Sequence, residues 1–158
     1  MATINFYHAQ GETPAAVDAL LPPLLEKAIQ AGAHILLVTP TAARRQRVDE
    51  ALWTYADAAF LPHATVDDAR PEAQPVLLAT AEDDMGAHLN GRLPVLLAGA
   101  ESALEGALQT SPEKLFYLFS AAPADVERAR ALWKTLKKQE GHTLTYWQKT
   151  DSGWSKKG

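Results

Sequence analysis

Apolar residues along the chain form short continuous runs that alternate with segments of helical spacing. Six of these runs predict strands, because each is rich in leucine, β-branched or aromatic residues and is bounded by turn residues. They cover residues 3–8, 34–39, 74–80, 93–99, 114–120 and 143–149. Most of them lack polar alternation, which is the pattern of strands buried on both faces of a parallel sheet.

Between these runs, apolar positions recur at the three- and four-residue spacing of helices with one buried face. The predicted helices cover residues 17–29, 41–55 and 123–140. Pro22 falls inside the first helix, so a kink or a restart is expected there, because proline is tolerated only at a first helical position. The hydroxyls of Thr39 and Thr41 provide a cap for the second helix. Residues 56–75, with three prolines and several acids, predict a long surface loop.

Strands that alternate with helices predict an α/β fold. We expect a three-layer, Rossmann-like domain whose sheet is mostly parallel and carries helices on both faces. The length of 158 residues favours one domain, assigned to residues 1–150, and is sufficient to bury a core without disulfides or metal. Residues 151–158 are predicted to be a flexible C-terminal tail.

Several classes of protein are excluded by residues that the chain lacks. It contains no cysteine, which excludes disulfides, thiolate metal sites and cysteine nucleophiles, and fits the reducing cytoplasm where we expect the protein to reside. Its longest apolar runs are far shorter than the ~20 residues of a membrane helix. Residues 1–10 have neither the basic nor the apolar segment of a signal peptide. We therefore expect no membrane partner.

Residues that would build an active site are missing from the positions where they are needed. The turn after the first strand, residues 9–14, has one glycine and an acid, so it is no nucleotide-binding glycine loop. No serine has the surroundings of a nucleophile elbow, and no two histidines have the i,i+4 spacing of a helical zinc site. We expect no enzymatic activity, no cofactor and no metal. The open alternative is a nucleotide-binding or enzymatic α/β domain that uses the carboxyl edge of the sheet.

Charge is distributed unevenly along the chain. The net charge is −4, yet residues 126–158 carry eight basic and three acidic residues. Such an excess suggests an anionic partner for this segment, either a nucleic acid or an acidic peptide. A simpler interpretation is that the lysines complement a helix dipole and keep a tail soluble. Direct binding of single-stranded DNA is disfavoured by the acidic remainder of the chain and by the lack of a visible stacking platform.

Two aromatic stretches carry a resemblance to a known family. The first runs from Asp49 to Trp53 and is followed by Phe60-Leu61-Pro62-His63. Trp53 lies on the flank of the apolar face of its helix, where a large aromatic residue serves as an interface anchor or covers the domain's own core. The second stretch reads Arg130-x-x-Trp133-Lys134, then Gly141-His142-x-Leu144-Thr145-Tyr146-Trp147. In this order and spacing the sequence, from Asn5 to about Lys149, resembles the chi subunit of bacterial DNA polymerase III.

This resemblance implies a non-catalytic adaptor in the clamp-loader assembly, with a Rossmann-like fold that binds no nucleotide. Proteins of this family bind the acidic, phenylalanine-ending C-terminal tail of single-stranded DNA-binding protein (SSB), so that they contact DNA only indirectly. They also pair with the psi subunit, which tethers them to the clamp loader. Carried over to this sequence, the tail-binding site comprises Arg130, Trp133, Lys134, Lys138, Gly141 and Leu144. The psi site falls on Trp53, Phe60, Pro62 and His63, and a helicase is another partner that this site could receive.

The chemistry of the first set agrees with an acidic peptide. A guanidinium pairs with a terminal carboxylate, lysines attract the acids, and an apolar pocket receives the phenylalanine. Arg130 lies three residues before Trp133, so the two share a helix face. The spacing from Trp133 to Gly141 is one residue longer than is usual in the family, which leaves the roles of Lys137 and Lys138 open.

Overall fold

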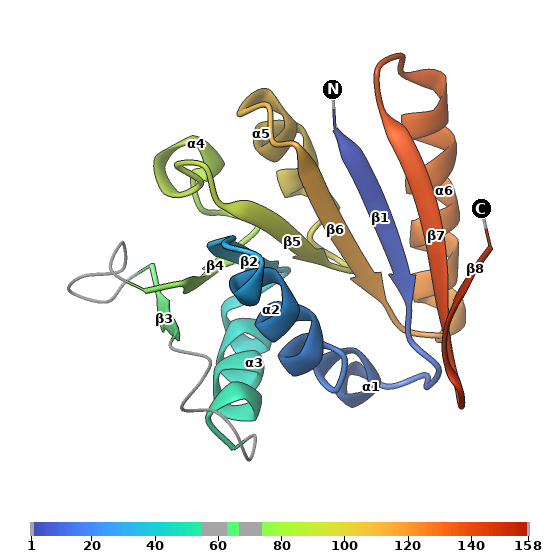
Figure 1. The fold of residues 1–158 in the computed structure, drawn as a ribbon, viewed down its shortest axis with the longest axis horizontal. Helices are drawn as coiled ribbons and strands as arrows, with labels where there is room; N and C mark the ends of the chain where they lie inside the picture. Colours follow the sequence, from blue (N-terminus) through green and yellow to red (C-terminus); the bar gives the residue numbers. More distant parts are fainter. Residues whose placement is uncertain (1, 55–62, 67–73, 158) are drawn as a thin grey trace.

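An eight-stranded sheet forms the middle layer of the protein (Figure 1). The computed structural model describes residues 2–54, 63–66 and 74–157. The strands are β1 (Thr3–His8), β2 (Ile35–Thr39), β3 (His63–Thr65), β4 (Val76–Thr80), β5 (Leu93–Leu97), β6 (Lys114–Phe119), β7 (Thr143–Thr150) and β8 (Gly153–Lys156). Their order in the sheet is β3-β4-β2-β5-β6-β1-β7-β8. Every neighbouring pair is parallel except β7 and β8, which form an antiparallel hairpin.

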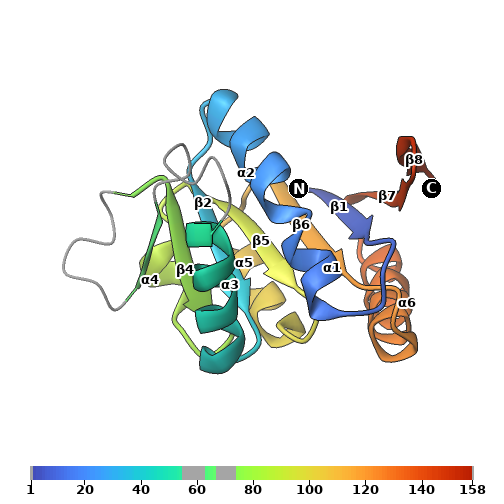
Figure 2. The same ribbon diagram turned by 90° about the horizontal axis from the view of Figure 1, so that it is seen from below.

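Helices cover both faces of this sheet (Figure 2). The helices are α1 (Pro14–Asp18), α2 (Leu21–Gln30), α3 (Ala42–Thr54), α4 (Met85–His88), α5 (Leu104–Gln109) and α6 (Pro123–Lys138), and a single 3-10 turn (Glu101–Ala103) precedes α5. Side chains of α1, α2 and α3 pack on one face, and side chains of α4, α5 and α6 pack on the other. This arrangement confirms the predicted three-layer, Rossmann-like α/β fold.

Continuous apolar runs produce the most deeply buried strands. All five residues of β2 and all five of β4 are buried, because helices from both layers cover these strands. Along β1, by contrast, burial alternates, since Ile4 and Phe6 point into the core beneath α6 while Asn5 and Tyr7 point to the opposite face. Six of the eight strands thus lie where the apolar runs predict them.

The predicted helix boundaries follow local chemistry. The first predicted helix is divided into α1 and α2, and α2 restarts at Leu21 with Pro22 in its first turn, where proline needs no hydrogen-bond donor. Thr41 caps α3, because its Oγ1 accepts a hydrogen bond of 3.1 Å from the backbone N–H of Arg44. Pro123 begins α6, as the sequence predicts.

Other elements differ from the prediction. The sequence predicts a flexible tail from residue 151, whereas Gly153–Lys156 form β8, whose Trp154 packs against Tyr7 and which pairs with the end of β7. The predicted loop of residues 56–75 contains the short strand β3. Both α4 and α5 are too short to show a helical period in the sequence.

Candidate functional site

Helix α6 carries a stripe of cationic and aromatic side chains along its exposed side. Arg130, Trp133, Lys134 and Lys137 stand at positions i, i+3, i+4 and i+7, so they lie one above another on the helix surface. The core side of the same helix is formed by Ala129, Leu132 and Leu136. We call the four side chains the α6 ridge.

Trp133 anchors this ridge to the core. Its half-buried indole meets the ring of Phe6 edge-on at a centroid distance of 5.1 Å, and the ring of Tyr146 at 6.1 Å. Phe6 lies on β1 and Tyr146 on β7, so the indole bridges the helix and two adjacent strands. Edge-to-face contacts of this kind fix the orientation of an aromatic ring. Trp133 therefore presents its remaining exposed surface in one defined position.

Lys137 and Arg130 lie on either side of Trp133 along the ridge. The Lys137 Nζ lies 5.8 Å from the centroid of the Trp133 ring, within the range of a cation–π contact. Arg130 is exposed and close enough to Tyr146 for its charge to lower the pKa of that hydroxyl, against the larger effect of burial, which raises it. Arg130 and Trp133 thus face the same residue, Tyr146, from adjacent turns of the helix.

The other predicted residues of the tail-binding set lie at or beyond the end of α6. Leu144 is half-buried on β7, on the same side of the strand as Tyr146, and packs against the core beneath α6. Gly141 is exposed and has a φ of +95°, with open space where a Cβ would stand, so glycine is needed there for the left-handed turn into β7. Lys138 is exposed in the last turn and lies farther around the helix from Trp133 than Lys137 does.

Two residues of this surface were absent from the sequence-based set. Lys137 belongs to the ridge, and the i+7 spacing from Arg130 is the signal that identifies it. Tyr146 is separated by one residue from Leu144, so the two share a face of β7. Trp133, Leu144 and Tyr146 together form an apolar surface beside the cations.

Beneath this surface, His8 and Phe119 complete an aromatic cluster. The His8 ring stacks on Phe119 at 4.7 Å, and its Nδ1 lies 2.6 Å from the Tyr146 hydroxyl. Burial lowers the pKa of His8, so the neutral imidazole is favoured in the folded protein. Its Nε2 is buried without a hydrogen-bond partner. These contacts hold Tyr146, and through it Trp133, in place.

The carboxyl edge of the sheet, where a nucleotide would bind in a Rossmann-like fold, carries acids instead. Asp125 accepts hydrogen bonds from the backbone N–H and the hydroxyl of Ser120 at the start of α6. Nearby, the buried Tyr117 hydroxyl donates to Glu101 at 2.5 Å, and burial together with this bond raises the pKa of Tyr117. Glu101 follows the carboxyl end of β5 and Asp125 follows that of β6, so their negative charge disfavours an anionic ligand beside them.

Half of the second predicted set lies outside the described residues. The backbone of Trp53 belongs to α3, and His63 is the first residue of β3. Phe60 and Pro62 fall in the segment that the structure does not describe. Within the described ranges, no helix is long and apolar enough to span a membrane.

Fold and topology define a class: a three-layer, Rossmann-like α/β domain whose last helix, α6, and the following strand, β7, present a cationic and aromatic surface. The family model of the DNA polymerase III chi subunit, HolC, matches residues 1–145, and the chain belongs to this family. The family is an accessory subunit of the DNA polymerase III holoenzyme. No curated protein has a sequence that matches the chain.

Proposed function

We propose that this chain is a non-catalytic adaptor of the clamp loader and that its α6 ridge binds the acidic C-terminal tail of SSB. The observation that carries the proposal is the stripe of Arg130, Trp133, Lys134 and Lys137 beside the apolar surface of Leu144 and Tyr146. An acidic peptide that ends in phenylalanine offers a terminal carboxylate, further acids and one apolar ring. The ridge offers a complementary group for each of them.

The strength of this binding follows from the exposure of the cations. Arg130, Lys134 and Lys137 are exposed, and exposed charge pairs contribute about 0.2–1 kcal/mol each. The affinity of the peptide should therefore be about micromolar and should fall as salt screens the charges. Lys138, Gly141 and Leu144 remain part of the proposed site, with Gly141 acting through the backbone turn.

The test compares two arginines on the same helix. Arg128 is bonded to Asp125 at 3.1 Å, whereas Arg130 lies on the ridge, and replacing either by alanine removes one positive charge. In calorimetric titrations with an acidic peptide ending in phenylalanine, Arg130→Ala should weaken binding at least several-fold, and Arg128→Ala should leave it nearly unchanged. If the wild type and Arg130→Ala bind the peptide with equal affinity, the α6 ridge is not the binding site of the tail. A peptide without its terminal phenylalanine is the control for the ligand.

We also propose that Trp53, Phe60, Pro62 and His63 form the contact with a psi subunit or, in its absence, with another replication partner such as a helicase. The proposal rests on the family and on the position of Trp53 in the last turn of α3. Copurification of a tagged psi subunit with the wild type and with Trp53→Ala tests it. Retained copurification of the variant, at wild-type levels, would contradict the assignment.

A further inference from the structure

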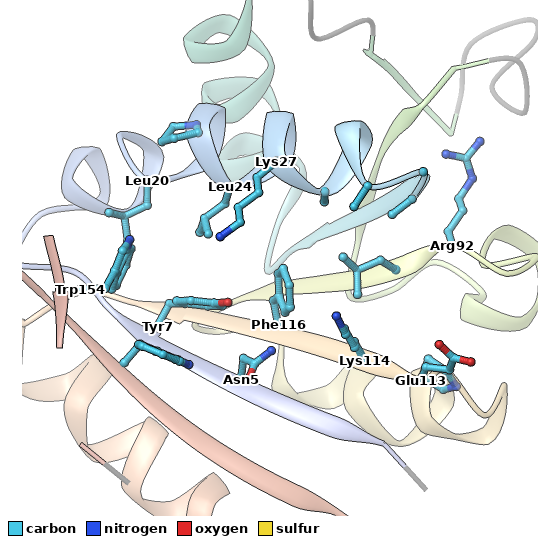
Figure 3. A pocket seen from close by; sticks show the side chains of 18 of the residues that line it. Asn5, Tyr7, Leu20, Leu24, Lys27, Arg92, Glu113, Lys114, Phe116 and Trp154 are labelled. Carbon is cyan, nitrogen blue, oxygen red and sulfur yellow. The ribbon is translucent and has the colours of Figure 1, made fainter. Parts of the chain in front are cut away.

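A long groove lies on the face of the sheet opposite to α6. It has a volume of about 1030 Å³, which is at the upper end of the range for small-molecule sites. Its floor is formed by β6, β1 and β7, one wall is α2, and β8 closes one end (Figure 3). In the described part of the chain no helix covers β1, β7 and β8 on this face, because the connection to β7 runs through α6 on the other side. We call this the α2 groove.

Four aromatic side chains line the floor of the α2 groove. Tyr7 meets Phe116 edge-on at a centroid distance of 5.2 Å and meets Trp154 at the same distance on its other side. Trp147 also lines the groove and is the neighbour of Tyr7 across the β1–β7 pair. These four rings are only partly buried, so each leaves part of its surface open to a ligand.

Lysine side chains from one helix and three strands lie at or beside the groove. Lys27 of α2, Lys114 of β6 and Lys149 of β7 line the groove, and Lys149 Nζ lies 5.7 Å from the Trp154 ring centroid. Lys156 of β8 pairs with Trp147, so it shares this face of the hairpin. Among the described residues that line the groove, Glu113 is the single acid, at the end remote from Trp154 (Figure 3). The groove is therefore cationic in a chain whose net charge is −4.

Arg92 is a different kind of cation. Its guanidinium is buried and donates hydrogen bonds to the backbone carbonyls of Ile35 and Pro75. This side chain holds strand ends together, so it is not counted among the groups available to a ligand. The available cations are lysines, which attract phosphates as point charges.

We infer that the α2 groove binds a short stretch of single-stranded nucleic acid. Lysines along a groove whose floor carries aromatic rings are the combination that holds a single strand without sequence preference, since phosphates take the charges and bases stack on the rings. The groove follows α2 from Leu20 to Ala31, which is about 16 Å at the rise of a helix, so it suits a linear polyanion better than a compact one. A duplex keeps its base faces covered and could not use the rings.

This inference extends beyond the proposed adaptor function and uses different residues. The sequence disfavours direct binding of single-stranded DNA because the rest of the chain is acidic and no stacking platform is visible in it. In the structure such a platform forms when β1, β6, β7 and β8 come together. The basic segment of residues 126–158 is divided by the sheet. Lys134 and Lys137 belong to the α6 ridge, while Lys149 and Lys156 lie on the groove face.

The experiment measures fluorescence anisotropy of a labelled short oligothymidylate as the full chain is added. Binding should weaken as salt rises from about 20 to 200 mM, with a slope of log K against log salt of about −2, as expected for three phosphate contacts on a single strand. The groove variant Lys114→Glu/Lys149→Glu should bind the oligonucleotide at least about tenfold more weakly, because two cations become anions. The variant Trp154→Ala should weaken it at least about fivefold through lost stacking.

A matched variant on the other face separates the groove from general electrostatics. Lys134→Glu/Lys137→Glu changes the net charge by the same amount but lies on the α6 ridge, so it should bind the oligonucleotide as the wild type does. With the acidic peptide the pattern should reverse: the ridge variant loses the peptide and the groove variant retains it. The two assays are therefore independent. If the peptide does not bind to the α6 ridge, the oligonucleotide result for the groove still holds, and if the oligonucleotide does not bind, the peptide result for the ridge still holds.

Three outcomes would overturn the inference. The first is that the oligonucleotide does not bind at about 20 mM salt. The second is that the groove and ridge variants lose oligonucleotide binding equally. The third is that the groove variant loses the acidic peptide and the ridge variant does not. The last result would make the groove a peptide site. Thermal unfolding shows whether each variant is folded, and Lys27→Gln/Lys114→Gln, which introduces no acid, replaces the groove variant if that one does not fold.

Discussion

The ammonium group of Lys137 lies 5.8 Å from the centroid of the Trp133 ring, one helical turn farther along α6. Trp133 itself meets Phe6 and Tyr146 edge-on, so the position of the cation is set by a ring that the core holds in place. The proposed peptide therefore meets a preoriented pair of a lysine and an aromatic ring. Lys138, the next residue, has no such contact with Trp133 among the contacts of the described residues.

This difference predicts unequal effects of the two neighbouring lysines. Lys137→Ala should weaken binding of the acidic peptide about two- to fivefold, the effect of losing one exposed charge pair. Lys138→Ala should weaken it less, because Lys138 lies farther around the helix from the indole. Both variants lose one charge, so each is the control for the other in calorimetric titrations at the same salt concentration. If Lys138→Ala weakens peptide binding more than Lys137→Ala does, the peptide binds on the side of α6 that carries Lys138 and not beside Trp133.

Trp133 should prove to have both a structural and a binding role. Trp133→Ala removes contacts with Phe6 and Tyr146, and for a half-buried ring we expect a loss of about 2 kcal/mol in the free energy of unfolding, less than a fully buried aromatic residue loses. Trp133→Tyr keeps an aromatic ring and should retain most of the stability and peptide binding. Urea unfolding and peptide titration of both variants separate the roles. Wild-type peptide binding by a folded Trp133→Ala variant would contradict the binding role.

The half-buried imidazole of His8 predicts a stability that depends on pH. Because burial lowers the pKa of His8 in the folded protein, the unfolded chain takes up a proton at a higher pH than the folded chain does. The stability that this group contributes is thus complete above about pH 6.5, the ordinary pKa of histidine, and is lost as the pH falls below it.

His8→Phe should remove this part of the pH dependence, because it replaces the imidazole stacked on Phe119 by a ring that does not titrate. Thermal unfolding temperatures between pH 7 and pH 5.5 test the prediction. An unfolding temperature of the wild type that is constant over this range would refute it.

An ion pair between two helices should be important for stability. Asp18 of α1 is only 8% exposed, and its Oδ1 lies 2.7 Å from Nη2 of Arg44 on α3. Asp18→Asn should lower the free energy of unfolding by about 1.5–3 kcal/mol, the value of a hydrogen bond to a charged group. Arg47 approaches the same carboxylate at 3.5 Å but is 55% exposed, so Arg47→Ala should cost less than about 1 kcal/mol. Urea unfolding of both variants measures the difference, and equal costs would contradict the role of burial.

Much of the architecture could be predicted because it follows from local chemistry. The first four residues of β2 and of β4 are apolar, a continuous pattern that is typical of strands covered on both faces of a parallel sheet. Pro22 marked the division between α1 and α2, and Pro123 the start of α6, because proline is confined to the first turn of a helix. Strand β8 escaped prediction because Gly153–Lys156 is short and polar, and its place depends on the contact of Trp154 with Tyr7.

Of the two candidate surfaces, the α6 ridge could be predicted from the sequence and the α2 groove could not. Arg130 and Trp133 lie three residues apart on one helix, so their common face was visible from helical spacing alone. The α2 groove has no such signature, because Lys27, Lys114 and Lys149 come from three distant elements. On the α6 face, likewise, the hydrogen-bond partners His8 and Tyr146 are 138 residues apart. The amino-acid order by itself determined the layers, the main strands and the cationic stripe of α6, because these depend on neighbours within a few residues. Which strands lie side by side, and hence where rings and lysines from remote segments meet, was decided only when the sheet assembled.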